Sequence, residues 1–253
     1  MAEQFLSCAY PALSPPIALP LITTAPHPCP YLPNREATLR AFGVDRLPGS
    51  LYHRFLDASF RRTGNIIYQP VCRGCRACQP LRVPVERFQP SKSQRRCWRR
   101  NQDLRVAVDL AKCSDEKWAL YAQYQSQRHG EAPGKNTAED RQAFESFLYS
   151  SPVDTIECTY RDMSGKLLGV GICDVCSQSL SSMYFFFDPS RVRRGLGIFG
   201  VMWELDYARR HNIAHYYLGF WINGCRNMKY KTDFRPYQIL RGDGQWRDAA
   251  EIS

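Results

Sequence analysis

Three cysteines separated by two residues each could bind a metal ion. Cys72, Cys75 and Cys78 form a Cys-x-x-Cys-x-x-Cys pattern. Thiolates at this spacing can reach adjacent vertices of a tetrahedral site, and iron–sulfur clusters use similar spacing. A fourth ligand would have to come from Cys29 or Cys97. The spacing therefore predicts either a structural zinc or iron–sulfur site or a group of reduced thiols, and both interpretations stay open.

Positive charge is concentrated around and directly after these cysteines. Residues 72–100 contain nine Lys or Arg against one acid, Glu86, in a chain whose net charge is +10. A cluster of this kind is typical of a surface that binds a polyanion, usually nucleic acid. A solvated face is the alternative, but the imbalance and the nearby Trp98 favour nucleic acid. The cations expected to make these contacts are Lys92, Arg95, Arg96, Arg99 and Arg100.

Two further patterns in the second half could hold an anionic substrate. Residues 191–197 read Arg-Val-Arg-Arg-Gly-Leu-Gly between an expected strand and an expected helix, where backbone amides at a helix N-terminus can bind an anion. This turn resembles the pyrophosphate turn of GNAT acyltransferases and suggests an acyl-CoA-dependent N-acetyltransferase. The aromatic run 216–222 precedes a loop that carries Lys229 and Lys231, which suits a pocket for a polar anion. A buried strand followed by a basic loop is the alternative.

Short helices and strands must position these residues. The periodicity predicts a helix within 51–60, a strand at 66–68, and a helix after Pro90 with Ser91 or Ser93 as its cap. We expect the strand 81–85 at a sheet edge, because Pro84 cannot donate a ladder hydrogen bond. Later elements are expected as a strand at 104–110, helices from Ser114 and Thr137, a meander of strands at 155–160, 167–176 and 183–187, a helix at 197–210 and a strand at 215–220. This order predicts an α+β (mixed α/β) fold.

Composition excludes several classes of protein. The chain has 253 residues, of which 44% are hydrophobic and 13% aromatic, and this predicts one large globular domain or two small ones. Residues 1–34 contain no Lys or Arg and eight prolines, so we expect a flexible arm over residues 1–28 and no secretory signal. Eleven cysteines without a disulfide framework, and no apolar run of about 18 residues, predict a soluble cytoplasmic protein without a membrane partner.

Three separated motifs carry a family resemblance. They are Phe88-x-Pro90-Ser91-Lys92-Ser93-Gln94-Arg95-Arg96, Phe187-Asp188-Pro189, and Tyr217-Leu218-Gly219-Phe220-Trp221-Ile222 followed by Met228-x-Tyr230-Lys231. They resemble the aminoacyl-tRNA–protein transferases of the N-degron pathway, most closely the bacterial aspartate/glutamate leucyltransferases, which are relatives of the eukaryotic arginyltransferases. The resemblance runs from about Cys29 to Trp246.

The resemblance implies a divided chain. We expect a smaller cysteine-bearing, tRNA-binding N-terminal domain over 29–103 and a GNAT-like C-terminal domain over 104–253. In the eukaryotic branch, cysteines of the N-terminal domain bind a metal or cluster. That branch carries a Cys-x-x-Cys pair where this chain has Cys29-Pro-Tyr-Leu32. The expected ligand set here is therefore Cys29, Cys72, Cys75 and Cys78.

The implied activity is transfer of leucine from leucyl-tRNA to proteins with N-terminal Asp or Glu, which marks them for degradation. The ester of an aminoacyl-tRNA is already activated, so we expect no cofactor to be required for the chemistry. Arginyl-tRNA as donor is the nearest alternative. A zinc-dependent RNA-binding module without catalysis is an alternative of another class.

The expected reaction and the positions of the residues suggest roles for some of them, and Asp188 is considered first because a strand end would place its carboxylate at a cleft. Asp188 is expected to orient or deprotonate the acceptor amine, with an Asp-Pro turn residue as the alternative. Tyr217 or Tyr230 is expected to donate a hydrogen bond to the oxyanion or the leaving group. We expect the basic block, with Lys92, Arg95, Arg96, Arg99 and Arg100, to bind the tRNA backbone. Candidates for the tRNA end or the acceptor carboxylate are Arg194, Lys229 and Lys231.

Overall fold

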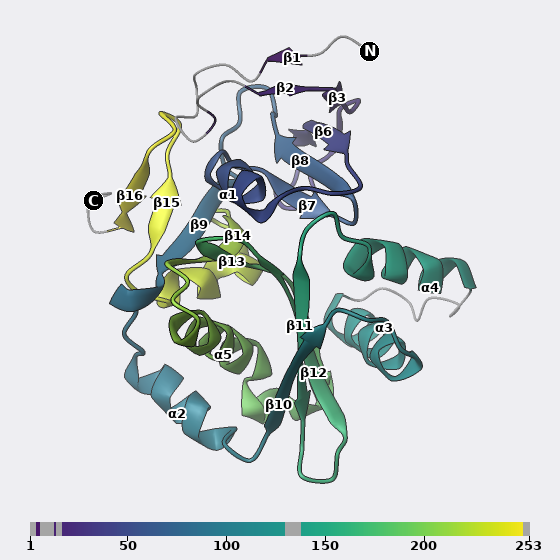
Figure 1. Ribbon diagram of the computed structural model, residues 1–253, viewed down its shortest axis with the longest axis vertical. Coiled ribbons are helices and arrows are strands. Elements are labelled where there is room, and N and C mark those ends of the chain that lie inside the picture. The colour runs from purple at the N-terminus through teal and green to yellow at the C-terminus, as the bar shows by residue number, and fades with distance from the viewer. Residues whose placement is uncertain (1–3, 6–12, 14–16, 130–137, 250–253) are drawn as a thin grey trace.

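An eight-stranded mixed sheet runs through the protein in the computed structural model, which describes residues 4, 5, 13, 17–129 and 138–249 (Figure 1). The strand order is β10-β11-β12-β13-β14-β9-β15-β16. Every neighbouring pair is antiparallel except β13 and β14. In this order the strands span Arg105–Leu110, Thr155–Arg161, Leu167–Val175, Ser179–Phe187, His215–Trp221, Gln79–Pro84, Gln238–Leu240 and Trp246–Asp248.

Helices cover both faces of this sheet, so the predicted α+β fold is confirmed. α5 (Leu196–Arg210) connects β13 to β14, because two parallel strands need a crossover. α2 (Lys92–Arg100) lies against α5, and α3 (Asp115–His129) and α4 (Ala138–Phe144) lie on the opposite face (Figure 1). The predicted meander is confirmed as β11, β12 and β13.

The parallel strands β13 and β14 separate soon after they meet. Their pairing covers only Ser179–Ser181 opposite His215–Tyr217. The next part of β14 contains a bulge, where Gly219 has a φ of 75° that favours glycine. Because the two strands diverge there, the sheet contains a fork between residues 181–183 and 218–220, and this fork positions the candidate site.

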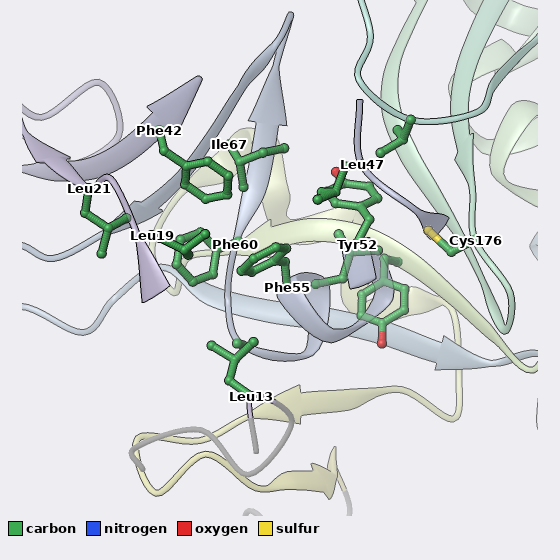
Figure 2. Close-up of a cluster of buried hydrophobic side chains, with 14 residues drawn as sticks. Leu13, Leu19, Leu21, Phe42, Leu47, Tyr52, Phe55, Phe60, Ile67 and Cys176 are labelled. Carbon is green, nitrogen blue, oxygen red and sulfur yellow. The ribbon is translucent and has the colours of Figure 1, made fainter. Parts of the chain in front are cut away.

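A smaller layer from the N-terminal half packs above the fork. It contains a four-stranded sheet in the order β3-β6-β8-β7 and the helix α1 (Gly49–Asp57). Its strands span Ile22–Thr23, Leu39–Gly43, Ile66–Pro70 and Arg61–Thr63. The rings of Phe42, Phe55 and Phe60 meet in the core of this layer (Figure 2). Two short ladders, β1 (Gln4–Phe5) with β2 (Ala18–Leu19) and β4 (His27–Pro28) with β5 (Glu36–Ala37), complete the N-terminal part.

Two expectations about the N-terminal half need correction. Part of the predicted flexible arm is packed, because Leu19 and Leu21 are buried in the same core cluster as Phe55 (Figure 2). The prediction that the strand around Pro84 lies at a sheet edge is wrong. β9 lies between β14 and β15, and Pro84 is tolerated as its last residue. β9 also carries the N-terminal half into the sheet of the C-terminal half, across the boundary expected at residue 103.

Local sequence explains the helix that carries the basic block. Ser91 caps α2 in a capping box, in which Ser91 Oγ accepts from the Gln94 amide and Gln94 Oε1 accepts from the Ser91 amide. Short helical turns complete the fold: η2 (Val85–Arg87), η3 (Glu145–Tyr149), η4 (Pro189–Arg194) and η5 (Arg226–Asp233). Within the described ranges, no helix is both long and apolar enough to span a bilayer.

Candidate active site between the two halves

A pocket of about 140 Å³ lies at the fork between β13 and β14. The separating strands form one wall of the pocket, and the N-terminal layer forms the opposite wall. η5 closes one side with Met228 and Lys231. The full lining is Tyr31, Tyr52, Arg61, Arg62, Tyr68, Asp174, Ser181, Ser182, Met183, Leu218, Gly219, Phe220, Met228 and Lys231. The pocket therefore needs residues from both halves of the chain.

Positive charge dominates this pocket. Three cationic side chains line it, and the one carboxylate among the lining residues, Asp174, is held by Arg62. Lys231 Nζ donates a 2.7 Å hydrogen bond to the carbonyl oxygen of Phe220. Burial, and then the charge of Arg61, lower the pKa of Lys231 to about 8. Because Arg62 is paired with Asp174, the charges of Arg61 and Lys231 are left for an anionic ligand.

Arg62 and Asp174 join the two halves of the chain beside the pocket. Arg62 lies on β7 and Asp174 on β12, and both side chains are almost completely buried. Nε and Nη2 of Arg62 donate to the two carboxylate oxygens at 2.8 and 2.6 Å. Tyr52 and Thr155 also donate to this carboxylate. A buried pair with this many hydrogen bonds fixes how the N-terminal layer sits on the fork.

The basic helix α2 is connected to the pocket through η5. The five predicted polyanion-binding cations of α2, Lys92, Arg95, Arg96, Arg99 and Arg100, are all exposed. Its buried face packs on α5, where the rings of Trp98 and Phe199 lie 5.4 Å apart. Gln94 Nε2 donates a 3.2 Å hydrogen bond to the carbonyl oxygen of Asp233 at the end of η5. The same short helix carries Lys229, which is exposed, and Lys231, which reaches the pocket.

α2 covers the glycine-rich turn that precedes α5. Gly195 begins α5 with a left-handed φ of 66°, and a Cβ there would meet Cys97 Sγ at 3.3 Å. Asn101 Nδ2 donates to the carbonyl oxygen of Arg194 at 2.9 Å. The Arg194 guanidinium pairs with Asp103 at 2.7 Å, so its charge is already neutralised. The turn is packed against protein at the place where a pyrophosphate would have to approach.

Asp188 lies at the end of β13, as predicted, but its surroundings are those of a capping residue. Its Oδ1 accepts from the amide and hydroxyl of Ser190, and its Oδ2 accepts from Lys166 at 3.0 Å. The residue is only 1% exposed. Burial acts to raise the pKa of Asp188, but the hydrogen bonds from Ser190 and Lys166 outweigh it and lower the pKa. A carboxylate with a lowered pKa is a weak base.

The structure does not bring Asp188 and Tyr217 together. Tyr217 pairs with Ser181 near the start of β13, and Asp188 follows seven residues later. Seven residues of strand span roughly 20 Å. Asp188 therefore lies well away from the pocket, and these contacts favour the turn interpretation over the base.

Tyr217 is buried and its hydroxyl is occupied. The hydroxyl donates to Asp57 and accepts a 3.2 Å hydrogen bond from Arg82 Nη1. Burial, then the charge of Asp57, raise the pKa of Tyr217. The face of its ring lies 5.5 Å from the guanidinium carbon of Arg61. Tyr217 therefore positions Arg61, and its contacts do not leave a free hydroxyl for an oxyanion.

Tyr230 lies on η5 between Lys229 and Lys231, but it is 38% exposed and is not among the residues that line the pocket. Burial, and then the charge of Glu204, raise the pKa of Tyr230 to about 12, so its hydroxyl stays protonated and can donate. Glu204 is 1% exposed, and burial raises its pKa to about 7. The Tyr216 hydroxyl donates to Glu204 Oε2. Tyr230 can donate a hydrogen bond, and its role as a donor stays a prediction.

The four cysteines of the predicted metal site lie near one another. Burial, and then Cys72, Cys29 and Cys75, raise the pKa of Cys78 to about 12. A metal bound here would have to displace the proton of this thiol. Across the described residues, no group of three His, Cys, Asp or Glu side chains is arranged to hold a metal ion. The cysteines as placed form no such group, and the metal site stays a prediction.

Sequence reasoning missed the N-terminal wall of the pocket. Arg61 and Arg62 follow the apolar segment 51–60, and two adjacent arginines in such a setting could have marked a buried site. Both are at most 6% exposed. Their partners, Asp174 and Tyr217, lie more than a hundred residues away. A local sequence pattern cannot predict contacts between residues so far apart in the chain.

Comparisons with known proteins identify relatives of both halves of the chain. Family models described as the N terminus and the C terminus of arginine-tRNA-protein transferase match residues 27–96 and 116–241. An aspartate/glutamate leucyltransferase of Hahella chejuensis is 41% identical over 87% of this chain and 93% of that protein. One of Stenotrophomonas maltophilia strain R551-3 is 40% identical over 91% of this chain and 93% of that protein.

Solved structures are more distant. L-PGS from Bacillus licheniformis has a TM-score of 0.47 and 11% sequence identity, over 79% of this chain and 62% of that chain. The two family models and the similar relatives cover most of the sequence, including both walls of the pocket. The chain therefore belongs to the arginine-tRNA-protein transferase family and is an aminoacyltransferase that works on an aminoacyl-tRNA and a protein acceptor.

Proposed function

We propose that the protein transfers leucine from leucyl-tRNA to the α-amine of proteins that begin with Asp or Glu, and so marks them for degradation. The names of its relatives support leucine as the donated residue. The observation that carries the proposal is the link from the exposed cations of α2 to the pocket, through the Gln94–Asp233 hydrogen bond and η5. A polyanion surface leads to a pocket with excess positive charge, which suits a tRNA donor and an acidic acceptor.

The reaction needs positioning more than activation. The neutral α-amine attacks the ester carbonyl, a C–N bond forms, and the C–O bond to the tRNA 3′ oxygen breaks. The proton lost by the amine ends on that oxygen, so atoms balance without a cofactor. An α-amine has a pKa of about 7.7–8.0, and a useful fraction is neutral at physiological pH. Tyr230 is the proposed hydrogen-bond donor to the oxyanion or to the leaving oxygen.

Acyl-CoA is a poorer candidate for the donor. α2 packs over the Gly195 turn, and Arg194 is paired with Asp103, so the turn lacks the open amides and free charge that a pyrophosphate needs. We expect acetyl-CoA neither to bind tightly nor to act as donor.

The direct test offers labelled leucyl-tRNA and arginyl-tRNA with peptides that differ only in their first residue: Asp, Glu, Lys or Arg. The expected result is leucine on the Asp and Glu peptides and little transfer elsewhere. Transfer of arginine to the same peptides would show that arginyl-tRNA is the donor, and it would leave the proposed acidic acceptor unchanged. Leucine on the Lys and Arg peptides would overturn the acidic acceptor.

A further inference from the structure

Arg61 is a buried arginine with one unoccupied edge. It is 6% exposed, and its Nη1 donates to the carbonyl oxygens of Leu56 and Phe60 at 3.3 and 2.6 Å. Among the described residues, no atom accepts a hydrogen bond from its Nε or its Nη2. A buried guanidinium with two unpartnered donor nitrogens is unfavourable unless a ligand satisfies them. Arg61 lines the pocket at the fork between β13 and β14, so the ligand is expected there.

The neighbouring residue shows what this edge of an arginine binds. Nε and Nη2 of Arg62 hold both oxygens of the Asp174 carboxylate. Arg61 leaves the same two nitrogens free. The planar fork of a guanidinium matches the two oxygens of a carboxylate, as it also matches two oxygens of a phosphate. An acidic side chain in the pocket would repeat at Arg61 the pairing that Asp174 makes with Arg62.

Aromatic rings fix Arg61 in this orientation before any ligand arrives. Its guanidinium carbon lies 5.5 Å from the centroid of the Tyr217 ring and 5.3 Å from that of Phe220. Tyr217 is itself held by its hydrogen bond to Asp57. Lys231, bonded to the carbonyl oxygen of Phe220, adds a second positive charge to the same pocket. A rigid binding group loses little entropy when its ligand binds.

The size of the pocket selects the kind of anion. Its volume of about 140 Å³ is close to that of a cavity of roughly 150 Å³ that holds benzene. It therefore accommodates one short side chain and excludes a nucleotide. The phosphates of the tRNA have their own surface on α2. We propose that Arg61 binds the side-chain carboxylate of the first residue of the acceptor and determines the choice of Asp and Glu. This inference rests on the proposed function.

The test compares acceptor peptides that differ only in charge. Transfer of labelled leucine is measured with peptides that begin with Asp or Asn, and with Glu or Gln. We expect Arg61→Met to lower kcat/KM for the Asp peptide by roughly 100-fold or more and to bring the Asp/Asn ratio close to one. The KM for leucyl-tRNA should stay unchanged. Arg61→Lys keeps the charge but loses the two-nitrogen fork, so an intermediate ratio is expected.

Controls separate this inference from the proposed function and from folding. Arg46→Met removes an exposed arginine outside the pocket and should leave both the ratio and the activity unchanged. Circular dichroism and thermal unfolding check that the Arg61 variants fold. If Arg61→Met does not fold, the Asp/Asn ratio of Arg61→Lys decides whether Arg61 binds the acceptor carboxylate. A wild-type protein that transfers no leucine to any acidic peptide would defeat the proposed function. A wild type that transfers leucine, with folded Arg61 variants that keep its Asp/Asn ratio or lose tRNA affinity instead, would overturn only the role of Arg61.

Discussion

Gln94 Nε2 donates a hydrogen bond to the carbonyl oxygen of Asp233, and this contact ties the basic helix α2 to η5, which supplies Lys231 to the pocket. Gln94 is the N3 residue of α2, and its side-chain oxygen closes the capping box with Ser91. One side chain therefore sets the start of the helix and its distance from the pocket. Any tRNA held by α2 would be placed in a defined position relative to the reacting end.

The exposed face of α2 should carry most of the tRNA affinity. Arg96 and Arg99 are exposed, so replacing both with Glu changes charge without opening the core. We expect tRNA affinity to fall by roughly 10- to 100-fold at about 0.1 M salt, and the dependence on salt to become weaker, because fewer phosphate contacts release fewer counterions. Filter binding or fluorescence anisotropy over a salt series measures both effects.

A matched pair of changes on another surface controls for net charge. Arg35 and Arg46 are exposed in the N-terminal half, and their replacement by Glu alters the total charge by the same amount. Affinity should fall only slightly in this variant. Equal losses in the two double variants would show that total charge, and not α2, holds the tRNA.

Lys231 should weaken the fold while it serves the pocket. Its pKa is about 8 in the folded protein and 10.5 in the unfolded chain, so between these values the unfolded chain binds more protons. The contribution of Lys231 to stability should therefore become more favourable as pH increases from 8 to 10.5. Lys231→Met should raise the free energy of unfolding at pH 7 by about 1–3 kcal/mol and lose that advantage near pH 10.5, while transfer to acidic peptides falls.

Lys229→Met is the matched control for this prediction. Lys229 lies on the same short helix but is exposed, so its replacement should hardly change stability. Denaturant unfolding from pH 7 to 10.5 measures both variants. A Lys231→Met protein that is less stable than the wild type at pH 7 would contradict the assigned burial of this charge.

The sequence predicts the local parts of this structure well and the pocket poorly. The capping box of Ser91, the meander and the helix over 197–210 depend on neighbouring residues, and all are found. The position of β9 depends on pairing with β14, which is more than a hundred residues away in the chain. Pro84 alone therefore gave the wrong edge assignment.

In the candidate site, too, the sequence predicts local features and misses contacts between distant residues. Lys231 was predicted from a loop that follows an aromatic strand, and it reaches the pocket. Arg61 and Asp174 were missed, because their importance comes from which partner each one has or lacks across the interface between the two halves. The strand end predicts Asp188 as a site residue, but it does not reveal that Lys166 and Ser190 occupy the carboxylate.

Glu204 should make stability fall as pH rises through the neutral range. Burial raises its pKa from 4.5 to about 7, so between these values the folded protein binds more protons than the unfolded chain. The sign of this difference means that Glu204 lowers stability progressively from pH 4.5 to 7. Glu204→Gln should be more stable than the wild type by about 1–3 kcal/mol at pH 8, with the difference much smaller at pH 4.5.

Glu139→Gln controls for the loss of an acid at an exposed position. It should show no such pH dependence when unfolding is measured in urea at pH 4.5, 6 and 8. A Glu204→Gln advantage that is equal at all three values would contradict the raised pKa of Glu204.

Asp188 should act as a cap and not as the base. Asp188→Asn removes the ion pair with Lys166 but keeps an oxygen that can accept from Ser190, and Asp188→Ala removes both. We expect Asp188→Ala to lower the free energy of unfolding by about 1–2 kcal/mol and Asp188→Asn to lower it by less. Because the pKa of Asp188 is lowered, this contribution is present above the unfolded pKa near 3.8 and is lost as pH falls through the folded value.

The rate of transfer decides between the two roles of Asp188. The carboxylate lies roughly 20 Å along β13 from the residue that pairs with Tyr217, so kcat per folded molecule should stay within about threefold of the wild type in Asp188→Asn. Lys166→Met is the control, since it removes the same ion pair and leaves the carboxylate. A large loss of kcat in Asp188→Asn, with Lys166→Met fully active and both proteins folded, would return Asp188 to the mechanism as the base.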